Sequence, residues 1–340
     1  GDTKETAEGL VMVGYYHFDD KEYDKATELF EQSIKMFEKL DDQIGIAKGL
    51  NAMGNLSSAV KKHDAALDYH TRSLDIGQKI DDKMRIMTSF NNIGYTHADR
   101  ENYTTAIDFL QKALSLSREL GNANGEALNL NNIGWNYQSL GDIESAIPYF
   151  KQHIALRQRL GQKDWAVGSM SFLGWSLLNM GNYNEAYETF EKTIKLRSKE
   201  QQQGKSWDWY GMSTIHFLKG EFEKANEFLD RIFDLRKEYQ IEGDEGMLDL
   251  ITLQYLIYIE LGKDFDLQVI RNLLKDKKLE DMRMDSKFYL YQLLGDKSFL
   301  EHAYEDVQKT VNKLEGEKKE SYLNYTYVKL IVEEHTKVMN

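Results

Sequence analysis

Asparagine side chains recur at a spacing of 40 residues in the first half of the chain, at Asn51, Asn91 and Asn131. An asparagine amide carries both a hydrogen-bond donor and an acceptor, so one side chain can pair with the N–H and the C=O of a peptide backbone. A row of such amides would hold an extended peptide with little regard to its side chains. Positions four residues later lie on the same side of a helix, and aromatic residues there would add an apolar surface with a polar edge. This second position holds Asn55, Tyr95, Trp135 and Trp175.

The sequence offers no motif for catalysis or for metal binding. Eight histidines occur, and none stands in an H-E-x-x-H or other metal-ligand spacing. Phosphate-binding glycine motifs and the G-x-S-x-G nucleophile motif are missing, and the absence of cysteine excludes disulfides, thiolate metal sites and a cysteine nucleophile. The many carboxylates lie on predicted helical surfaces, where nothing singles out an acid–base pair. We therefore expect a non-enzymatic protein with no catalytic residue, no metal site and no cofactor.

Small residues recur with the same period and indicate the elements that position the asparagines. The stretch from Ala127 to Leu160 fits two helices joined by a Gly141-Asp142 turn, and small residues at Gly134 and Ala146 would let these helices pack closely. A fixed period with small residues held in place is typical of a stacked helical repeat. The glycine recurs as Gly14, Gly54, Gly94, Gly134 and Gly174, and the alanine as Ala26, Ala66, Ala106, Ala146 and Ala186.

These positions resemble the tetratricopeptide repeat (TPR) pattern W-x2-L-G-x2-Y…A-x3-F. The period differs, since the usual TPR repeat has about 34 residues and this one has 40. The longer period is similar to that of kinesin light chains, Pins/LGN-type adaptors and many bacterial TPR signalling proteins. HEAT and armadillo repeats also have periods near 40, but their signature lacks the spacing of 12 between Gly134 and Ala146. The tryptophan position of the pattern holds Leu10, Leu50, Phe90, Leu130 and Met170.

The resemblance implies an all-α fold, a right-handed TPR superhelix (an α-solenoid) of stacked helix-turn-helix repeats, with about 17 helices and almost no strand. The first helix of each repeat would line a concave groove that binds a peptide or a protein partner. The carboxylate clamp of chaperone-binding TPRs needs Lys and Arg beside Asn, and the clamp positions here hold Asn, Tyr and Trp. We therefore predict binding through backbone and apolar contacts. The predicted contact residues are Asn51, Asn55, Asn91, Tyr95, Asn131, Trp135, Trp175 and Tyr210.

Each of these residues also has a purely structural interpretation. Asn92 and Asn132, beside the asparagine row, could satisfy backbone groups between repeats. A tryptophan on the first helix of a repeat could belong to the core, and isolated asparagines could bind only water. The cluster from Trp207 to Tyr210 would be either an aromatic wall of the groove or the core of a shifted repeat, and we favour the core.

The register of the repeats divides the chain into two parts. Residues 1–240 hold six TPR-like repeats of about 40 residues, and residues 241–340 hold degenerate repeats and a capping helix, predicted over residues 316–337. Degenerate repeats are expected at the end of a stack, where one face must be polar. Turn pairs such as Asp41-Asp42 and Asp81-Asp82 separate the repeats, and their side chains suit the capping of the next helix.

Composition narrows the class of partner. The formal net charge of −13 argues against binding to nucleic acid, which needs clustered Lys and Arg. It is mildly consistent with a basic partner, but a solubilising acidic exterior is the better explanation of the charge. No apolar run approaches 18 residues, so we expect no membrane span. A cytoplasmic location is the default expectation.

Two functions of different class follow from the resemblance. The first is a scaffold that binds a peptide or partner segment in its groove, as the repeat region of a signalling or regulatory protein. The alternative is a peptide-sensing regulator of the bacterial Rap type that lacks the N-terminal three-helix bundle of those proteins, because the repeats begin by residue 10. An all-helical enzyme has no motif in its favour.

Overall fold

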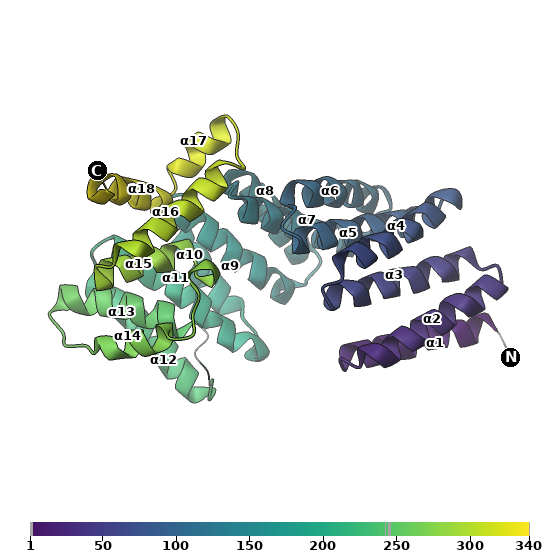
Figure 1. Cartoon of the computed structure of the whole chain (residues 1–340), viewed down its shortest axis with the longest axis horizontal. Coiled ribbons are helices and arrows are strands. Elements are labelled where there is room, and N and C mark those ends of the chain that lie inside the picture. Colours follow the sequence, from purple (N-terminus) through teal and green to yellow (C-terminus); the bar gives the residue numbers. More distant parts are fainter. Residues whose placement is uncertain (1–2, 242, 244–245, 340) are drawn as a thin grey trace. The chain divides into compact units, whose positions relative to one another are not determined.

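The computed structural model describes residues 3–241, 243 and 246–339, and these residues form eighteen α-helices, two short 3₁₀ helices and no β-strand (Figure 1). The predicted all-α fold is confirmed, and successive antiparallel helix pairs make it an α-solenoid. The first six helix pairs are α1 (Lys4–Asp19) and α2 (Tyr23–Lys39), α3 (Gln43–Ala59) and α4 (His63–Lys79), α5 (Lys83–Asp99) and α6 (Tyr103–Glu119), α7 (Ala123–Leu140) and α8 (Ile143–Arg159), α9 (Lys163–Asn179) and α10 (Tyr183–Leu196), and α11 (Lys205–Leu218) and α12 (Phe222–Glu238).

The remaining helices are shorter and less regular. They are α13 (Met247–Leu261), α14 (Leu267–Leu274), α15 (Met284–Leu294), α16 (Lys297–Val311), α17 (Glu317–Leu323) and α18 (Thr326–Met339), and the 3₁₀ helices are η1 (Lys199–Gly204) and η2 (Leu279–Asp281).

The chain divides into two compact units, residues 1–139 (unit 1) and 140–340 (unit 2). Within unit 1 each helix from α1 to α5 packs against the next one. The first helices of successive pairs also contact one another, α1 with α3 and α3 with α5, so they form a layer of their own. We call the first helix of each pair the A helix and the second the B helix. The predicted contact residues of unit 1 lie on the A helices α3, α5 and α7.

Close packing of A on B helices explains the glycine period. A Cβ atom added to Gly14 would lie 2.5 Å from the ring of Phe30, and one added to Gly174 would lie 2.5 Å from the ring of Phe190. Such distances are too short for a real side chain, so the pairs pack this closely only because glycine is present. Gly134 is also buried. The periodic alanines of the B helices, from Ala26 to Ala186, are all fully buried.

The turns between helices repeat every 20 residues in the first five pairs. Each contains one residue with a positive φ angle, for example Asp41 (52°) and Gly161 (72°). The following residue often caps the next helix, as predicted: the Asp42 side chain accepts a hydrogen bond of 3.0 Å from the N–H of Gly45. Asp82 and Asn122 cap α5 and α7 in the same way.

In unit 2 the pair α11–α12 is shifted, with Ala225 standing 39 residues after Ala186. A buried polar network holds the junction before this pair. The Ser171 hydroxyl donates to the Asp208 carboxylate over 2.6 Å, and the Arg197 guanidinium donates to the same carboxylate over 2.8 Å. This network links α9, the residue after α10, and α11.

The C-terminal helices of unit 2 pack against its A and B helices. Leu248, Ile270 and Leu290 belong to a core shared by α13, α14 and α15. The single helix predicted over residues 316–337 is instead two helices, α17 and α18. Asn324 and Tyr325 separate the two helices, and the side chains of Tyr322, Tyr325 and Tyr327, on both sides of this break, are buried.

Candidate functional site

The A-helix layer of unit 1 carries two adjoining pockets that share Tyr95 and Asp99. Tyr95 stands one residue after the glycine of α5, and its side chain is 54% exposed. Trp135 holds the same position on α7 and is 39% exposed. Exposure alone does not distinguish these two rings, since Tyr16 and Trp165 are more exposed still; what distinguishes Tyr95 and Trp135 is that both line a pocket beside side-chain amides.

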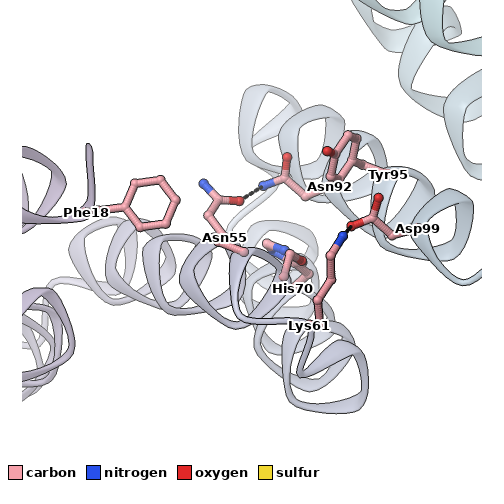
Figure 2. Close-up of a pocket in the computed structure, with 9 residues that line it drawn as sticks. Phe18, Asn55, Lys61, His70, Asn92, Tyr95 and Asp99 are labelled. Atoms are coloured by element: carbon pink, nitrogen blue, oxygen red, sulfur yellow. Dashed lines mark hydrogen bonds and ion pairs between the residues drawn. The ribbon is translucent and has the colours of Figure 1, made fainter. Parts of the chain in front are cut away.

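The first pocket lies between α3 and α5 and has a volume of about 320 Å³ (Figure 2). A chain of side-chain hydrogen bonds crosses it: the Asn92 amide donates to the Asn55 oxygen over 3.3 Å, and the Asn55 amide donates to the Tyr15 hydroxyl over 3.3 Å. Lys61 lies 3.4 Å from the Asp99 carboxylate at the other side of the pocket. The pocket is lined by Phe18, Asn55, Ser58, Ala59, Lys61, His70, Asn92, Tyr95 and Asp99.

The second pocket lies between α5 and α7 and has a volume of about 290 Å³. The indole of Trp135 is held edge-on to the ring of Tyr103, with 6.1 Å between the centroids. Since Tyr103 opens the neighbouring B helix, this contact fixes one wall of the pocket. The only charged side chain in the lining is Asp99, and the lining residues are Tyr95, Ala98, Asp99, Leu110, Asn131, Asn132, Trp135 and Asn136.

The structure does not bring Asn51, Asn91 and Asn131 together as one row. Asn51 is 6% exposed, and its Oδ1 accepts from Nδ1 of the buried His70 over 3.1 Å. Asn91 is half-buried and donates to Asn92 over 3.3 Å. Of the three, Asn131 lines one of the two pockets. Whether any of them contacts a ligand stays a prediction.

Helical geometry explains which side chains reach the pockets. With 3.6 residues per turn, Asn92 and Asp99 lie on one side of Tyr95, whereas Asn91 lies on the other side. The 40-residue recurrence of Asn92 and Asn132 was visible in the sequence, but these residues were assigned to internal hydrogen bonding. The Asn92 side chain bonds to the side-chain amides of Asn55 and Asn91 rather than to backbone groups, and it lines a pocket as well. Asp99 was missed, because its position holds Asp19, Ala59, Ser139 and Asn179 in the other repeats and so shows no strict 40-residue period.

In unit 2 the corresponding residues are covered by the chain itself. Trp175 is 5% exposed and Tyr210 is 3% exposed. The guanidinium of Arg283 lies 5.7 Å from the ring centroid of Trp175, 5.2 Å from that of Trp207 and 5.8 Å from that of Tyr210. Burial raises the pKa of the Tyr210 hydroxyl well above its ordinary value. The cluster from Trp207 to Tyr210 thus belongs mainly to the core, which is the interpretation that the sequence favoured. The Trp207 ring is partly exposed.

Unit 2 holds two further pockets of a different kind. One, of about 490 Å³, lies among α10, α11 and α12 and is lined by side chains of both charges, such as Glu191, Lys195 and Arg231. The other, of about 210 Å³, lies beside Arg283 and Asp249. Neither contains a row of amides. In the described part of the chain no group of three or more His, Cys, Asp or Glu residues could hold a metal ion.

Among the described residues, none of the helices has both the length and the apolar character that crossing a membrane requires.

Comparison with protein families assigns the repeats. One tetratricopeptide repeat profile matches residues 5–79 and 85–159, and a second matches residues 167–200. Together they cover more than half of the chain. The chain belongs to the tetratricopeptide repeat family. The resemblance seen in the sequence is therefore confirmed. No curated protein matches the sequence of this chain.

Solved structures share the fold at low sequence identity. The apo form of RapI is 16% identical, with a TM-score of 0.57 over 84% of this chain and 99% of its own. The apo form of the quorum sensor NprR from B. thuringiensis is 16% identical, with a TM-score of 0.57 over 99% of this chain and 88% of its own. A signal transduction ATPase with a TPR sensor from Pyrococcus horikoshii is 16% identical, with a TM-score of 0.68; the match covers 87% of this chain and 45% of that one. These likenesses show the fold alone.

Proposed function

We propose that this TPR protein binds a short extended segment of a partner protein or peptide along the A helices α3, α5 and α7 of unit 1. The observation that carries the proposal is the pair of pockets that share Tyr95 and Asp99. Side-chain amides in both pockets can pair with a peptide backbone, and the exposed rings of Tyr95 and Trp135 can cover apolar side chains.

The site is narrower than the one expected from the sequence. The proposed site keeps four of the predicted residues, Asn55, Tyr95, Asn131 and Trp135, and adds Asn92 and Asp99. Asn51 is engaged with His70 inside the helix packing, and Trp175 and Tyr210 are engaged with Arg283. A partner could reach the latter residues only if Arg283 moved away.

A signalling or regulatory role is part of the same proposal. NprR is described as a quorum sensor, and a Rap protein of 18% identity was solved in complex with competence and sporulation factor, with a TM-score of 0.50. We infer a similar use of the helical stack here, as the repeat region of a regulatory protein. The Rap-type regulator remains the alternative form of this proposal.

The test is selection of phage-displayed random 12-residue peptides on the full chain. Enriched peptides should bind the Tyr95→Ala and Trp135→Ala variants at least tenfold more weakly, because truncating an aromatic anchor at an interface typically costs about 2 kcal/mol or more. Tyr16→Ala and Trp165→Ala are matched controls, since both side chains are exposed and line neither pocket. Failure to enrich any peptide, or equal binding to all four variants, would contradict the proposal.

A further inference from the structure

In unit 2, aromatic residues of the A helices α9 and α11 bind a side chain from a later part of the same chain. The occupant is Arg283, which stands just before α15. Its guanidinium lies within 6 Å of three ring centroids, those of Trp175, Trp207 and Tyr210. It is paired with the Asp285 carboxylate and lies 4.0 Å from that of Asp249. A cation over aromatic faces with a carboxylate beside it is a favourable site for a guanidinium.

The pocket between α5 and α7 of unit 1 offers the same chemistry with no occupant from the described chain. Trp135 and Tyr95 hold the position one residue after the A-helix glycine, which is the position of Trp175 on α9. Their rings are exposed, and they line the pocket together with one carboxylate, that of Asp99. The amides of Asn131, Asn132 and Asn136 line it as well and can accept from N–H groups.

We infer that this pocket takes an arginine side chain of the bound segment, with Asp99 as its counter-ion and the rings of Tyr95 and Trp135 against the guanidinium plane. This inference rests on the proposed function and specifies its ligand. Arginine fits better than lysine because its planar group stacks on aromatic rings and is more weakly hydrated than an ammonium. The net charge of −13 favours the approach of a basic segment.

The position of Asp99 supports this assignment. Its only described ion-pair partner is Lys61, at 3.4 Å, and the Lys61 side chain is largely exposed. Exposed ion pairs contribute little, so an incoming guanidinium can compete for the carboxylate at small cost. Lys61 lines only the neighbouring pocket. The side of Asp99 that faces α7 therefore has no cationic lining residue.

The test uses peptides enriched on the full chain from the random library. Enriched peptides that depend on Tyr95 and Trp135 should contain arginine, and replacing this arginine by citrulline, its neutral isostere, should weaken binding about tenfold or more. Asp99→Asn should abolish most of the preference for arginine over citrulline. Lys61→Gln should preserve or increase it. The control for general charge is Asp68→Asn, which removes one negative charge at an exposed side chain that lines neither pocket.

The outcomes separate the two proposals. Peptides that need Tyr95 and Trp135 but bind equally well with citrulline would overturn the arginine site and leave the groove in place. An arginine preference that survives Asp99→Asn, or that Asp68→Asn reduces as strongly, would also overturn it, because attraction to the acidic surface would then explain the preference. Absence of any peptide that depends on Tyr95 and Trp135 would overturn the groove itself.

Discussion

His70 is a buried polar residue at a position that the neighbouring B helices fill with apolar side chains. It packs against Gly54, as Phe30 packs against Gly14. Burial lowers the pKa of His70 from 6.5 to about 4. Well above pH 6.5 the ring is neutral in both the folded and the unfolded chain, so it adds no pH dependence there. As the pH falls from 6.5 to about 4, only the unfolded chain takes up the proton, and folding stability is lost.

A double variant, Asn51→Val with His70→Phe, should remove this loss. It reproduces the pair Val11 and Phe30 of the first repeat and leaves no unpaired amide behind. Between pH 7.5 and 4.5 the wild type should lose roughly 2–3 kcal/mol more unfolding free energy than the variant. Urea unfolding at the two pH values measures the difference, and other titrating groups are common to both chains. Equal losses would show that His70 does not stay neutral in the folded state.

Single residues also mark the limit of what the pattern could predict. The recurrence of Asn51, Asn91 and Asn131 was real, but their roles differ because each repeat has different neighbours. Asn51 faces a histidine, and its amide oxygen is used inside the protein. The 40-residue period alone could not reveal this hydrogen bond, because His70 stands at a position where the other B helices carry Phe or Leu. Trp135 and Tyr95, by contrast, are exposed, and their contact with a ligand stays a prediction.

At the scale of helices, close approach between A and B helices should determine stability. Gly174→Ala would place a methyl group 2.5 Å from the buried ring of Phe190, and overpacking of this kind costs about 1–3 kcal/mol. Gly168 lies on the same helix with nothing within 4 Å of an added Cβ. Gly168→Ala should therefore stabilise by about 0.5–1 kcal/mol through helix propensity. Thermal unfolding of the two variants should shift in opposite directions; a shift in the same direction would refute the packing argument.

The regular helices were predictable because local signals agree with the packing. Turn residues such as Asp42 cap the helix that follows, and small residues such as Gly94 stand where the helices cross. The C-terminal third lacks this agreement. There the break between α17 and α18 depends on which side chains are buried against distant helices. Tyr327 is one of these, and its hydroxyl lies 2.7 Å from that of Tyr289.

At the scale of the whole chain, the sequence could not predict that two of the predicted contact residues are covered from within. Arg283 lies far along the chain from Trp175, and no repeat register connects them. Arg283 can cover these rings only because helices that follow the last regular pair pack against earlier helices of unit 2. Such contacts depend on tertiary packing of irregular segments, which periodicity does not describe. The open positions of unit 1 and the covered positions of unit 2 thus look alike in sequence.

The last two helices should be essential for the stability of unit 2. Lys318 lies 2.5 Å from the buried carboxylate of Asp142, and the Thr326 hydroxyl donates to the Leu178 carbonyl over 3.1 Å. Deleting residues 316–340 would remove both contacts, as well as the Tyr327 partner of Tyr289. The deletion would also remove the buried side chains of Tyr322, Val328 and Ile331 and expose apolar surface of unit 2, at a cost of about 25 cal/mol per Å².

Amide hydrogen exchange would locate the effect of this deletion. Amides of α8, α9 and α15 should exchange faster, because these helices hold Asp142, Leu178 and Tyr289 or adjoin them. Amides of α3 and α4 should keep their protection, since none of the lost contacts involves these helices. Tyr327→Phe is the milder control: it removes one hydroxyl and should affect α15 most. Unchanged exchange in α9 and α15 after the deletion would mean that α17 and α18 do not hold unit 2 together.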